Sequence, residues 1–358
     1  MTAQDTVPTL RELGAHGEQE AAFARYAGPY IAGRVASRHR TAFDVLVPGS
    51  AVRVGVSGAL RRTGRAPAVG DFVVILDRPE AGTRMIVAIL PRRTTVSRGA
   101  PGEGGDAQVI AANIDTVFVV TAAGSDFNLR RLERYLAVVH ASGAAPVILV
   151  NKADLADDAE ALRAEAAAVA GGVPVLAVSA LQGSGFSALA PFLQPGQTVA
   201  LIGSSGVGKS TIINALITDA RQETGHVRAY DGKGRHTTSV RQLFVLPGGA
   251  MVIDNPGLRE IPLGSAAAGI GEAFADVIGL AARCRYGDCR HEGEPGCAVR
   301  AAVEDGSLPE ARLQSYLRLV REAEFQAEKA AIGLKRMEKR KWKGIGAEAR
   351  RFRDDRGH

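Results

Sequence analysis

The chain has 358 residues, of which 46% are hydrophobic and 23% charged, a composition typical of globular proteins and not of disordered or fibrous ones. No apolar run approaches the about 18–20 residues of a membrane-spanning helix, and the start lacks the basic and apolar regions of a secretory signal. We therefore expect a cytoplasmic protein of two or three domains. The formal net charge of +6 permits a polyanionic partner, whereas an aromatic content of 5% does not favour a base-stacking surface for single strands.

The first part of the chain is expected to hold a small barrel. Residues 1–29 form a polar N-terminal extension, and residues 30–95 contain β-rich segments such as "AVRVGVSG" and "DFVVILD", separated by glycine, proline and basic turns. Five such strands within about 60 residues predict an OB-like β-barrel, the alternative being a small sandwich of no particular function. Residues 91–108 are rich in glycine, proline and arginine, which predicts a linker or an exposed loop.

The middle part, residues 96–270, alternates strands with helices. This alternation predicts a doubly wound α/β domain. A hairpin with Gly248 and Gly249 at its turn is expected near the end of this domain. Residues 271–358 are expected to be helical around a group of cysteine and histidine residues and to end in a basic tail. The segments with the pattern of buried parallel strands are "DTVFVVTAA", "APVILVNKAD", "VPVLAVSAL" and "TVALIGSSG".

The segment "GSSGVGKS" matches a phosphate-binding P-loop, and it stands between an apolar strand and a helix, as this motif requires. Its backbone N–H groups would face the phosphates, Lys209 would neutralise β- and γ-phosphate oxygens, and the Ser210 hydroxyl would bind Mg²⁺. In "DNPG", Asp254 would hold Mg²⁺ and the Gly257 N–H would contact the γ-phosphate. The phosphate-binding residues expected are Gly203, Ser204, Ser205, Gly206, Val207, Gly208, Lys209, Ser210, Thr211 and Gly257.

The segment "NKAD", residues 151–154, predicts the guanine reader. Asp154 would accept hydrogen bonds from guanine N1–H and the 2-amino group, and since adenine lacks both donors, ATP would leave the carboxylate unpaired. Asn151 would contact the base edge, and the stem of Lys152 would cover the ring. In "VSAL", a backbone N–H would reach guanine O6. The base-reading residues expected are Asn151, Lys152, Ala153, Asp154, Ser179 and Ala180.

The order of these motifs along the chain is itself informative. The base reader precedes the P-loop, which precedes the Asp-x-Pro-Gly segment, whereas most small GTPases place the base reader last. This is a circular permutation, and the same strands can form the same sheet if the old termini are joined and new ones open in a surface loop. An ATPase is the alternative that the P-loop alone leaves open.

A compact group of soft ligands lies further on, as Cys-x4-Cys-x-His-x5-Cys. Three cysteines do not suit a disulfide framework, whereas three thiolates and one imidazole predict a closed, tetrahedral and therefore structural metal site. Zn²⁺ is the expected ion, with an iron site as the alternative. The ligands expected are Cys284, Cys289, His291 and Cys297.

With the permuted motifs, a barrel before them and a Cys/His module behind them, the chain resembles the bacterial ribosome small-subunit-dependent GTPase A family (RsgA, also called YjeQ) over nearly its whole length. The resemblance implies an OB barrel, a permuted GTPase domain and a zinc domain. It also implies GTP hydrolysis that the 30S subunit stimulates during its late maturation. We expect a monomer that contacts 16S rRNA and no membrane. Asn255 departs from the family's usual threonine at that position.

The segment "GKGRHTTSV", residues 232–240, matches the switch segment of that family. Thr238, rather than Thr237, would reach Mg²⁺ and the γ-phosphate. Leu258 follows "DNPG" where many GTPases carry a glutamine that orients water, so catalysis must take a group from elsewhere, and His236 is the candidate that the family resemblance also indicates. The catalytic residues expected are His236, Lys209 and Thr238.

The basic tail from Lys335 to Lys343 and three barrel-loop arginines are candidate contacts to RNA phosphates, or else solvated charges. The arginines are Arg61, Arg62 and Arg65. Two other functions stay open, a GTPase that acts on another ribosomal or structured RNA particle and an RNA-binding assembly factor with a vestigial nucleotide site. We also hypothesise that γ-phosphate sensing after Asp254 repositions the Cys/His module against rRNA.

Overall fold

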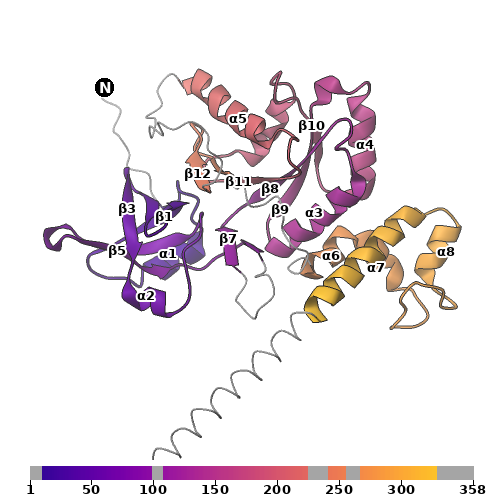
Figure 1. Ribbon diagram of the computed structural model, residues 1–358, viewed down its shortest axis with the longest axis horizontal. Coiled ribbons are helices and arrows are strands. Elements are labelled where there is room, and N and C mark those ends of the chain that lie inside the picture. The colour runs from indigo at the N-terminus through magenta and orange to yellow at the C-terminus, as the bar shows by residue number, and fades with distance from the viewer. Residues whose placement is uncertain (1–9, 99–107, 225–240, 255–266, 329–358) are drawn as a thin grey trace, which may run out of the picture.

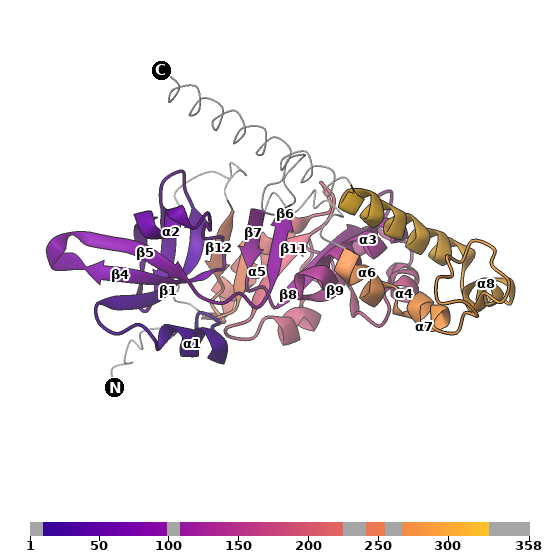
Figure 2. The ribbon, with the colours of Figure 1, turned by 90° about the horizontal axis from the view of Figure 1, so that it is seen from below.

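The computed structural model describes residues 10–98, 108–224, 241–254 and 267–328, with side chains described outside residues 98 and 218–224. It has three parts, and Figures 1 and 2 show an α/β sheet in the middle, with a β-barrel on one side and a helical region on the other. We call these parts the barrel (residues 30–89), the α/β region (residues 116–254) and the C-terminal region (residues 267–328). No helix among the described residues is long and apolar enough to cross a membrane.

The barrel is a closed ring of five strands, as the sequence predicts. Hydrogen bonds join the strands in the order β1-β2-β3-β5-β4, and β4 pairs back onto β1. Valines and isoleucines alternate into the interior, for example at Val45 and Val47, which gives the strands their inward face. The elements are α1 (Gly17–Phe23) before the barrel, then β1 (Tyr30–Arg38), β2 (Phe43–Val47), β3 (Ser50–Val56), α2 (Gly58–Arg62), β4 (Phe72–Arg78), η1 (Pro79–Ala81) and β5 (Thr83–Ile89).

Two local predictions about this part were wrong. Residues 95–98 of the expected linker form strand β6 (Thr95–Arg98), which pairs with β7 (Gln108–Ala112), because β-branched residues there find an antiparallel partner beyond the glycine-rich stretch. Arg61 and Arg62 lie in the last turn of α2 and not in a loop, since Ser57 caps that helix by accepting from the Leu60 N–H.

The α/β region contains a six-stranded sheet in the order β10-β9-β8-β11-β13-β12. Its strands are parallel except for β12, which pairs antiparallel with β13 across the expected turn at Gly248 and Gly249. The strands are β8 (Thr116–Ala122), β9 (Ala145–Asn151), β10 (Val175–Ala177), β11 (Thr198–Ile202), β12 (Gln242–Val245) and β13 (Met251–Asp254). The helices are α3 (Leu129–Ser142), η2 (Ala153–Leu155), α4 (Ala159–Val169), η3 (Phe186–Phe192) and α5 (Lys209–Thr224).

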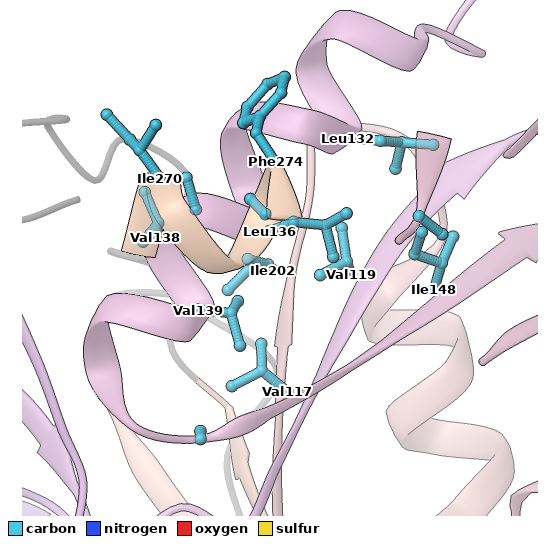
Figure 3. Packing of buried hydrophobic residues seen from close by; sticks show 14 of the residues in the cluster. Val117, Val119, Leu132, Leu136, Val138, Val139, Ile148, Ile202, Ile270 and Phe274 are labelled. Atoms are coloured by element: carbon cyan, nitrogen blue, oxygen red, sulfur yellow. The ribbon is translucent and has the colours of Figure 1, made fainter. Parts of the chain in front are cut away.

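Alternate residues of the central strands point to opposite faces of the sheet and belong to two separate hydrophobic cores. Val117 and Val119 of β8 pack with α3 and with the C-terminal region on one face, as Figure 3 shows. Phe118 and Val120 of the same strand pack with α5 on the other face. Because both faces of a parallel sheet are covered, its strands are near-continuous hydrophobic runs, which is why they could be recognised in the sequence.

The C-terminal region contains α6 (Ala267–Ala273), α7 (Ala275–Ala281), α8 (Ala298–Glu304) and a helix over residues 310–328, and it packs on α3 mainly through α6. From that last helix, Arg312 lies over the Phe274 ring, with its guanidinium carbon 4.1 Å from the ring centroid, and donates to Glu133 Oε1 of α3 at 2.8 Å. Glu133 has no exposed side-chain surface, so this buried pair fastens the C-terminal region to the α/β region.

The barrel and the α/β region share one continuous sheet. Ser37 of β1 pairs antiparallel with Gln242 of β12. Beside this contact Arg34, which is fully buried, donates to the Leu13 and Asn113 carbonyls at 2.7 and 2.8 Å and to Thr198 Oγ1 at 2.8 Å. Burial lowers the pKa of Arg34 to about 10, and none of its hydrogen-bond acceptors is a carboxylate.

We expect Arg34→Ala to destabilise this junction strongly. The change leaves several buried acceptors from both regions without a donor, which should lower the free energy of unfolding by at least about 3 kcal/mol. Urea denaturation followed by circular dichroism measures this loss. Arg84→Ala is the matched control, because Arg84 is an exposed barrel arginine paired with Asp77, and an exposed pair contributes at most about 1 kcal/mol. Equal losses of stability in the two variants would contradict the large contribution of Arg34 to the free energy of unfolding.

Candidate nucleotide and metal sites

The predicted nucleotide motifs follow the carboxyl ends of neighbouring strands. The P-loop follows β11, "NKAD" begins at the end of β9, the Ser179-Ala180 pair follows β10, and Asp254 ends β13. In an open parallel sheet the carboxyl ends lie along one edge, and this edge is where ligands bind in such folds. The fold therefore brings together motifs that lie far apart in the sequence.

Backbone geometry explains the glycines of the P-loop. Gly203 has φ +148°, and a Cβ there would lie 2.2 Å from the Val120 carbonyl oxygen. Gly208 has φ +97°, and a Cβ there would lie 2.3 Å from Asn151 Nδ2. Both positions require glycine, because side chains rarely adopt these angles and there is no space for one. The loop leads directly into α5 at Lys209, so the helix N-terminus faces it, an arrangement that attracts anions.

The Lys209 ammonium lies against the start of the loop. Its Nζ donates to the Gly203 carbonyl at 2.7 Å and to the Ser204 carbonyl at 2.5 Å. Ser210 and Thr211, in the first turn of α5, are exposed at the same end of the helix. A cation and two hydroxyl groups thus lie at the helix N-terminus. An ammonium group can pair with phosphate oxygens, and a hydroxyl group can bind a cation.

Asn151 links the base-reading segments to the P-loop. Its buried side chain donates from Nδ2 to the Val207 carbonyl at 2.8 Å and accepts at Oδ1 from the Ala180 N–H at 3.0 Å. The Asn151 side chain therefore bonds to the P-loop on one side and to the loop after β10 on the other. The Ala180 N–H is already bonded within the protein, so the predicted contact with guanine O6 requires that this donor be shared.

The other base-reading residues surround this link. Lys152 adopts the left-handed conformation, with φ +59°, and Ala153 donates its N–H to the Val178 carbonyl at 3.1 Å. Asp154 is half-buried in the short helix η2 that follows. Ser179 is fully buried and its hydroxyl accepts from the Gln182 N–H at 3.2 Å. These bonds fix the two loops that would surround a base.

At the other end of the site, Asp254 is half-buried as the last described residue of β13. The remaining predictions of the phosphate end lie outside the described residues. They are His236 and Thr238 of the switch, and Asn255, Gly257 and Leu258 after Asp254. The basic tail 335–343 also lies outside them.

The structure adds one residue that the sequence did not single out. Arg131, in the first turn of α3, contacts Ser204 Oγ of the P-loop and donates to Asp126 Oδ1 at 2.6 Å. The signal that could have indicated it is a basic residue in the first turn of the helix that follows β8, the strand beside β11. Helices that follow adjacent parallel strands begin at the same edge of the sheet.

The Cys/His group has the geometry of a metal site. Its four ligand atoms lie within 4.8 Å of one another. His291 Nδ1 lies 3.6 Å from the Cys284 sulfur and 3.4 Å from the sulfurs of Cys289 and Cys297, and the Cys284 and Cys297 sulfurs are 3.9 Å apart. Neighbouring ligands of a tetrahedral site with metal–sulfur bonds of about 2.3 Å should lie about 3.5–3.8 Å apart. The predicted ligand set thus fits one metal ion.

The surroundings of this group hold the ligands in place. His291 adopts φ +62°, and its carbonyl accepts from Arg300 Nε at 3.0 Å. Cys297 is the N-cap of α8 and accepts from the Arg300 N–H at 3.4 Å. An ion bound here would have all four tetrahedral positions filled by these protein ligands, with none left for water.

The sheet order, together with the order of the base reader, the P-loop and the Asp-x-Pro-Gly segment along the chain, defines a circularly permuted P-loop GTPase. Residues 89–264 match the model of the RsgA GTPase family. The chain is 56% identical to the small ribosomal subunit biogenesis GTPase RsgA of Methanosarcina acetivorans, over 98% of this chain and 93% of that protein. It is 47% identical to the RsgA of Opitutus terrae, over 94% of this chain and 96% of that protein.

Solved structures agree with these sequence matches. YjeQ from Thermotoga maritima is similar with a TM-score of 0.62 and 25% identity, over 82% of this chain and 98% of that one. YloQ, described as a circularly permuted GTPase, has the same fold with a TM-score of 0.59 and 23% identity, over 87% of this chain and 98% of that one. The chain belongs to the RsgA GTPase family, and it is a hydrolase that acts on GTP.

We expect Asn151→Ala to weaken nucleotide binding and stability together. It leaves the Val207 carbonyl and the Ala180 N–H without their partner, a loss of about 1–3 kcal/mol, and the affinity for GTP should fall at least about tenfold. Fluorescence titration and urea denaturation measure the two effects. Asn151→Asp should be no better, since its second carboxylate oxygen would face the Val207 carbonyl. Gln182→Ala is the control, because Gln182 is an exposed residue of the loop after β10 that contains Ala180. Unchanged nucleotide affinity in Asn151→Ala would contradict the organising role.

Proposed function

We propose that this protein binds GTP between the P-loop and "NKAD" and hydrolyses it on the small ribosomal subunit during late subunit maturation, as a cytoplasmic monomer that contacts 16S rRNA. The observation that carries the nucleotide assignment is the Asn151 link, which ties the phosphate-binding loop to the base-reading loops. The subunit assignment is supported by the relatives, which are named small ribosomal subunit biogenesis GTPases and match over nearly the full chain.

In this proposal the base and the phosphates are held by different strands. Asp154 accepts from guanine N1–H and the 2-amino group, and Lys152 covers the ring. The Ser179-Ala180 pair supports the base. The P-loop glycines expose backbone N–H groups to the phosphates, and Lys209 moves from the Gly203 carbonyl to the β- and γ-phosphates. Guanine is preferred because adenine would leave the Asp154 carboxylate unpaired.

Hydrolysis requires further groups at the phosphate end. Ser210, Thr238 and Asp254 would hold Mg²⁺, which neutralises charge on the phosphate oxygens when it is bound. The Gly257 N–H would contact the γ-phosphate. Because Leu258 has no polar group, His236 is assigned to orient the attacking water. This arrangement should make intrinsic hydrolysis slow, with the subunit needed to place the switch.

We expect GTP turnover to rise on addition of purified 30S subunits and to stay low with purified 50S subunits. Stimulation is expected because the bound subunit would help to place a water-orienting group at the γ-phosphate, where the Leu258 side chain offers none. Phosphate release measured with each subunit tests this. Lys209→Ala should abolish turnover, and His236→Ala should remove the stimulated part. Equal stimulation by 50S subunits would favour a GTPase that acts on another RNA particle. Normal growth of cells that lack the wild-type gene and carry Lys209→Ala instead would favour a scaffold with a vestigial nucleotide site.

The nucleotide arm of the same experiment separates GTP from ATP. Asp154→Asn exchanges an acceptor for a donor, so turnover should shift from guanine to xanthine nucleotides, whereas ATP should not be hydrolysed by either protein. Asp157→Asn is the matched control, because it is an exposed carboxylate three residues further on. Unchanged guanine preference in Asp154→Asn would contradict the assignment of the base reader.

We further propose that the ion of the Cys/His group is Zn²⁺. Three thiolates and one imidazole in a closed tetrahedron suit Zn²⁺, and the loop between α7 and α8 has little core of its own, so the ion would hold it folded.

We expect one zinc ion per chain. Elemental analysis of purified protein measures its identity and amount, and strong chelation should unfold residues 284–297 because four ligands lose their common partner. Cys289→Ser should lower the zinc content, whereas His39→Ala, in the barrel, should leave it unchanged. Stoichiometric iron in protein purified without oxygen would support the alternative ion instead.

A further inference from the structure

Arg131 makes a contact with the P-loop that none of the GTPase motifs explains. Its Nη1 donates to Ser204 Oγ and, at 2.6 Å, to Asp126 Oδ1. The same nitrogen therefore serves both acceptors, one in the P-loop and one in the loop before α3. Ser204 is held from a second direction, because its carbonyl accepts from Lys209 Nζ. Two cationic side chains thus meet at one P-loop residue.

Local structure holds Arg131 at this place. Asn128 caps α3 by accepting from the Arg131 N–H at 3.0 Å. The preceding loop is closed by the bond from the Phe127 N–H to the Gly124 carbonyl at 3.1 Å. Since α3 follows β8 and the P-loop follows the adjacent β11, the first turn of α3 lies beside the start of the P-loop.

Helix stability does not account for an arginine here. The N-terminus of a helix carries a partial positive charge, so a cation in the first turn is unfavourable. The first turn of α3 holds no acidic residue, and Arg130 adds a second cation. Asp126 compensates Arg131 only in part, because its side chain is 28% exposed and the pair is screened by water. The placement is favourable when an anion occupies the loop.

The helix that carries Arg131 is fixed further along. Glu133 is bonded to Arg312 at 2.8 Å and to Ser315 Oγ, and Arg134 pairs with Glu322 at 2.9 Å. Because all three partners belong to the C-terminal region, α3 and that region are held together as one unit. A guanidinium on such a helix can hold a loop in one position.

We infer that Arg131 is a positioning residue of the P-loop. It holds Ser204 through its hydroxyl and so keeps the loop in the shape that receives the nucleotide phosphates. The inference rests on the proposed nucleotide site at residues 203–210. It assigns a role to a helix that carries none of the predicted nucleotide-binding residues and makes Ser204 the point through which that helix acts.

A double-mutant cycle tests this role. The Kd values for fluorescent GDP and for a non-hydrolysable GTP analogue are measured with Mg²⁺ for the full-length wild type and for Arg131→Ala, Ser204→Ala and the double variant. Each single change should raise the Kd about tenfold. The double variant should also raise the Kd about tenfold rather than a hundredfold, because the two single changes remove the same interaction. The urea midpoint without nucleotide should not fall in Arg131→Ala.

Two further variants separate position from charge. Arg130→Ala is the matched control, since Arg130 is the neighbouring residue, is similarly exposed at 37% against 39%, and pairs with Glu133 instead of the P-loop. Its Kd should stay within about twofold of wild type. Arg131→Lys keeps the charge on a side chain one bond shorter, so it should restore less than half of the lost affinity on a logarithmic scale.

The outcomes are distinct. Additive effects in the cycle, full restoration by Arg131→Lys, or a fall in the urea midpoint that accounts for the whole loss of binding would each overturn the positioning role while the nucleotide site stands. If the wild type binds neither nucleotide, the proposed nucleotide site itself fails. Non-additive changes with an unaltered midpoint support the inference.

Discussion

The pairing of β12 with β13 on one side and with β1 on the other is the constraint on which the arrangement of the molecule depends. In register, Asp254 faces Gln242, Gln242 faces Ser37, and Ser37 faces Asp44. Paired residues of antiparallel strands lie on the same face of a sheet, so a polar row runs from the end of β13 into the barrel. The candidate Mg²⁺ ligand therefore lies two strands from the barrel, and a shift of β12 must be accommodated by β1.

Arg34 makes this junction rigid. A buried cation without a carboxylate partner is expensive unless its donors are satisfied, and here the acceptors come from the barrel, from the segment between the two regions and from β11. The cost of burial is offset only when all these segments are in place at once. The relative placement of the barrel and the α/β region is thus specified by the Arg34 hydrogen bonds together with the pairing of β1 and β12.

The sequence predicted the parts of the fold in which chemistry is local. Hydrophobic runs ending in "NKAD", in the P-loop or in Asp254 identified the parallel strands, and spacing alone identified Cys284, Cys289, His291 and Cys297 as one ligand group. It could not predict Arg34, which stands in a strand like any solvated arginine, or the pair of Glu133 with Arg312. Arg34 bonds to Thr198 and Glu133 bonds to Arg312, and in each pair the partners are more than 150 residues apart in the sequence. No local sequence pattern indicates such a contact.

The attachment of the C-terminal region limits how a nucleotide signal can reach it. Gly269 of α6 packs so closely on α3 that a Cβ would lie 2.0 Å from the Ala137 carbonyl oxygen, and Glu133 and Arg312 are bonded in the same interface. Separating the two regions would also expose the apolar side chains that they bury against each other, such as Ile270, Phe274 and Leu136, and each fully buried side chain of this size contributes about 1.5–3 kcal/mol. Repositioning of the Cys/His module as a free body would therefore cost about as much as the roughly 5.5 kcal/mol of differential binding that reverses a two-state equilibrium. Motion that keeps α3 and the C-terminal region together avoids this cost, and it would carry Arg131, and with it Ser204, along the same path.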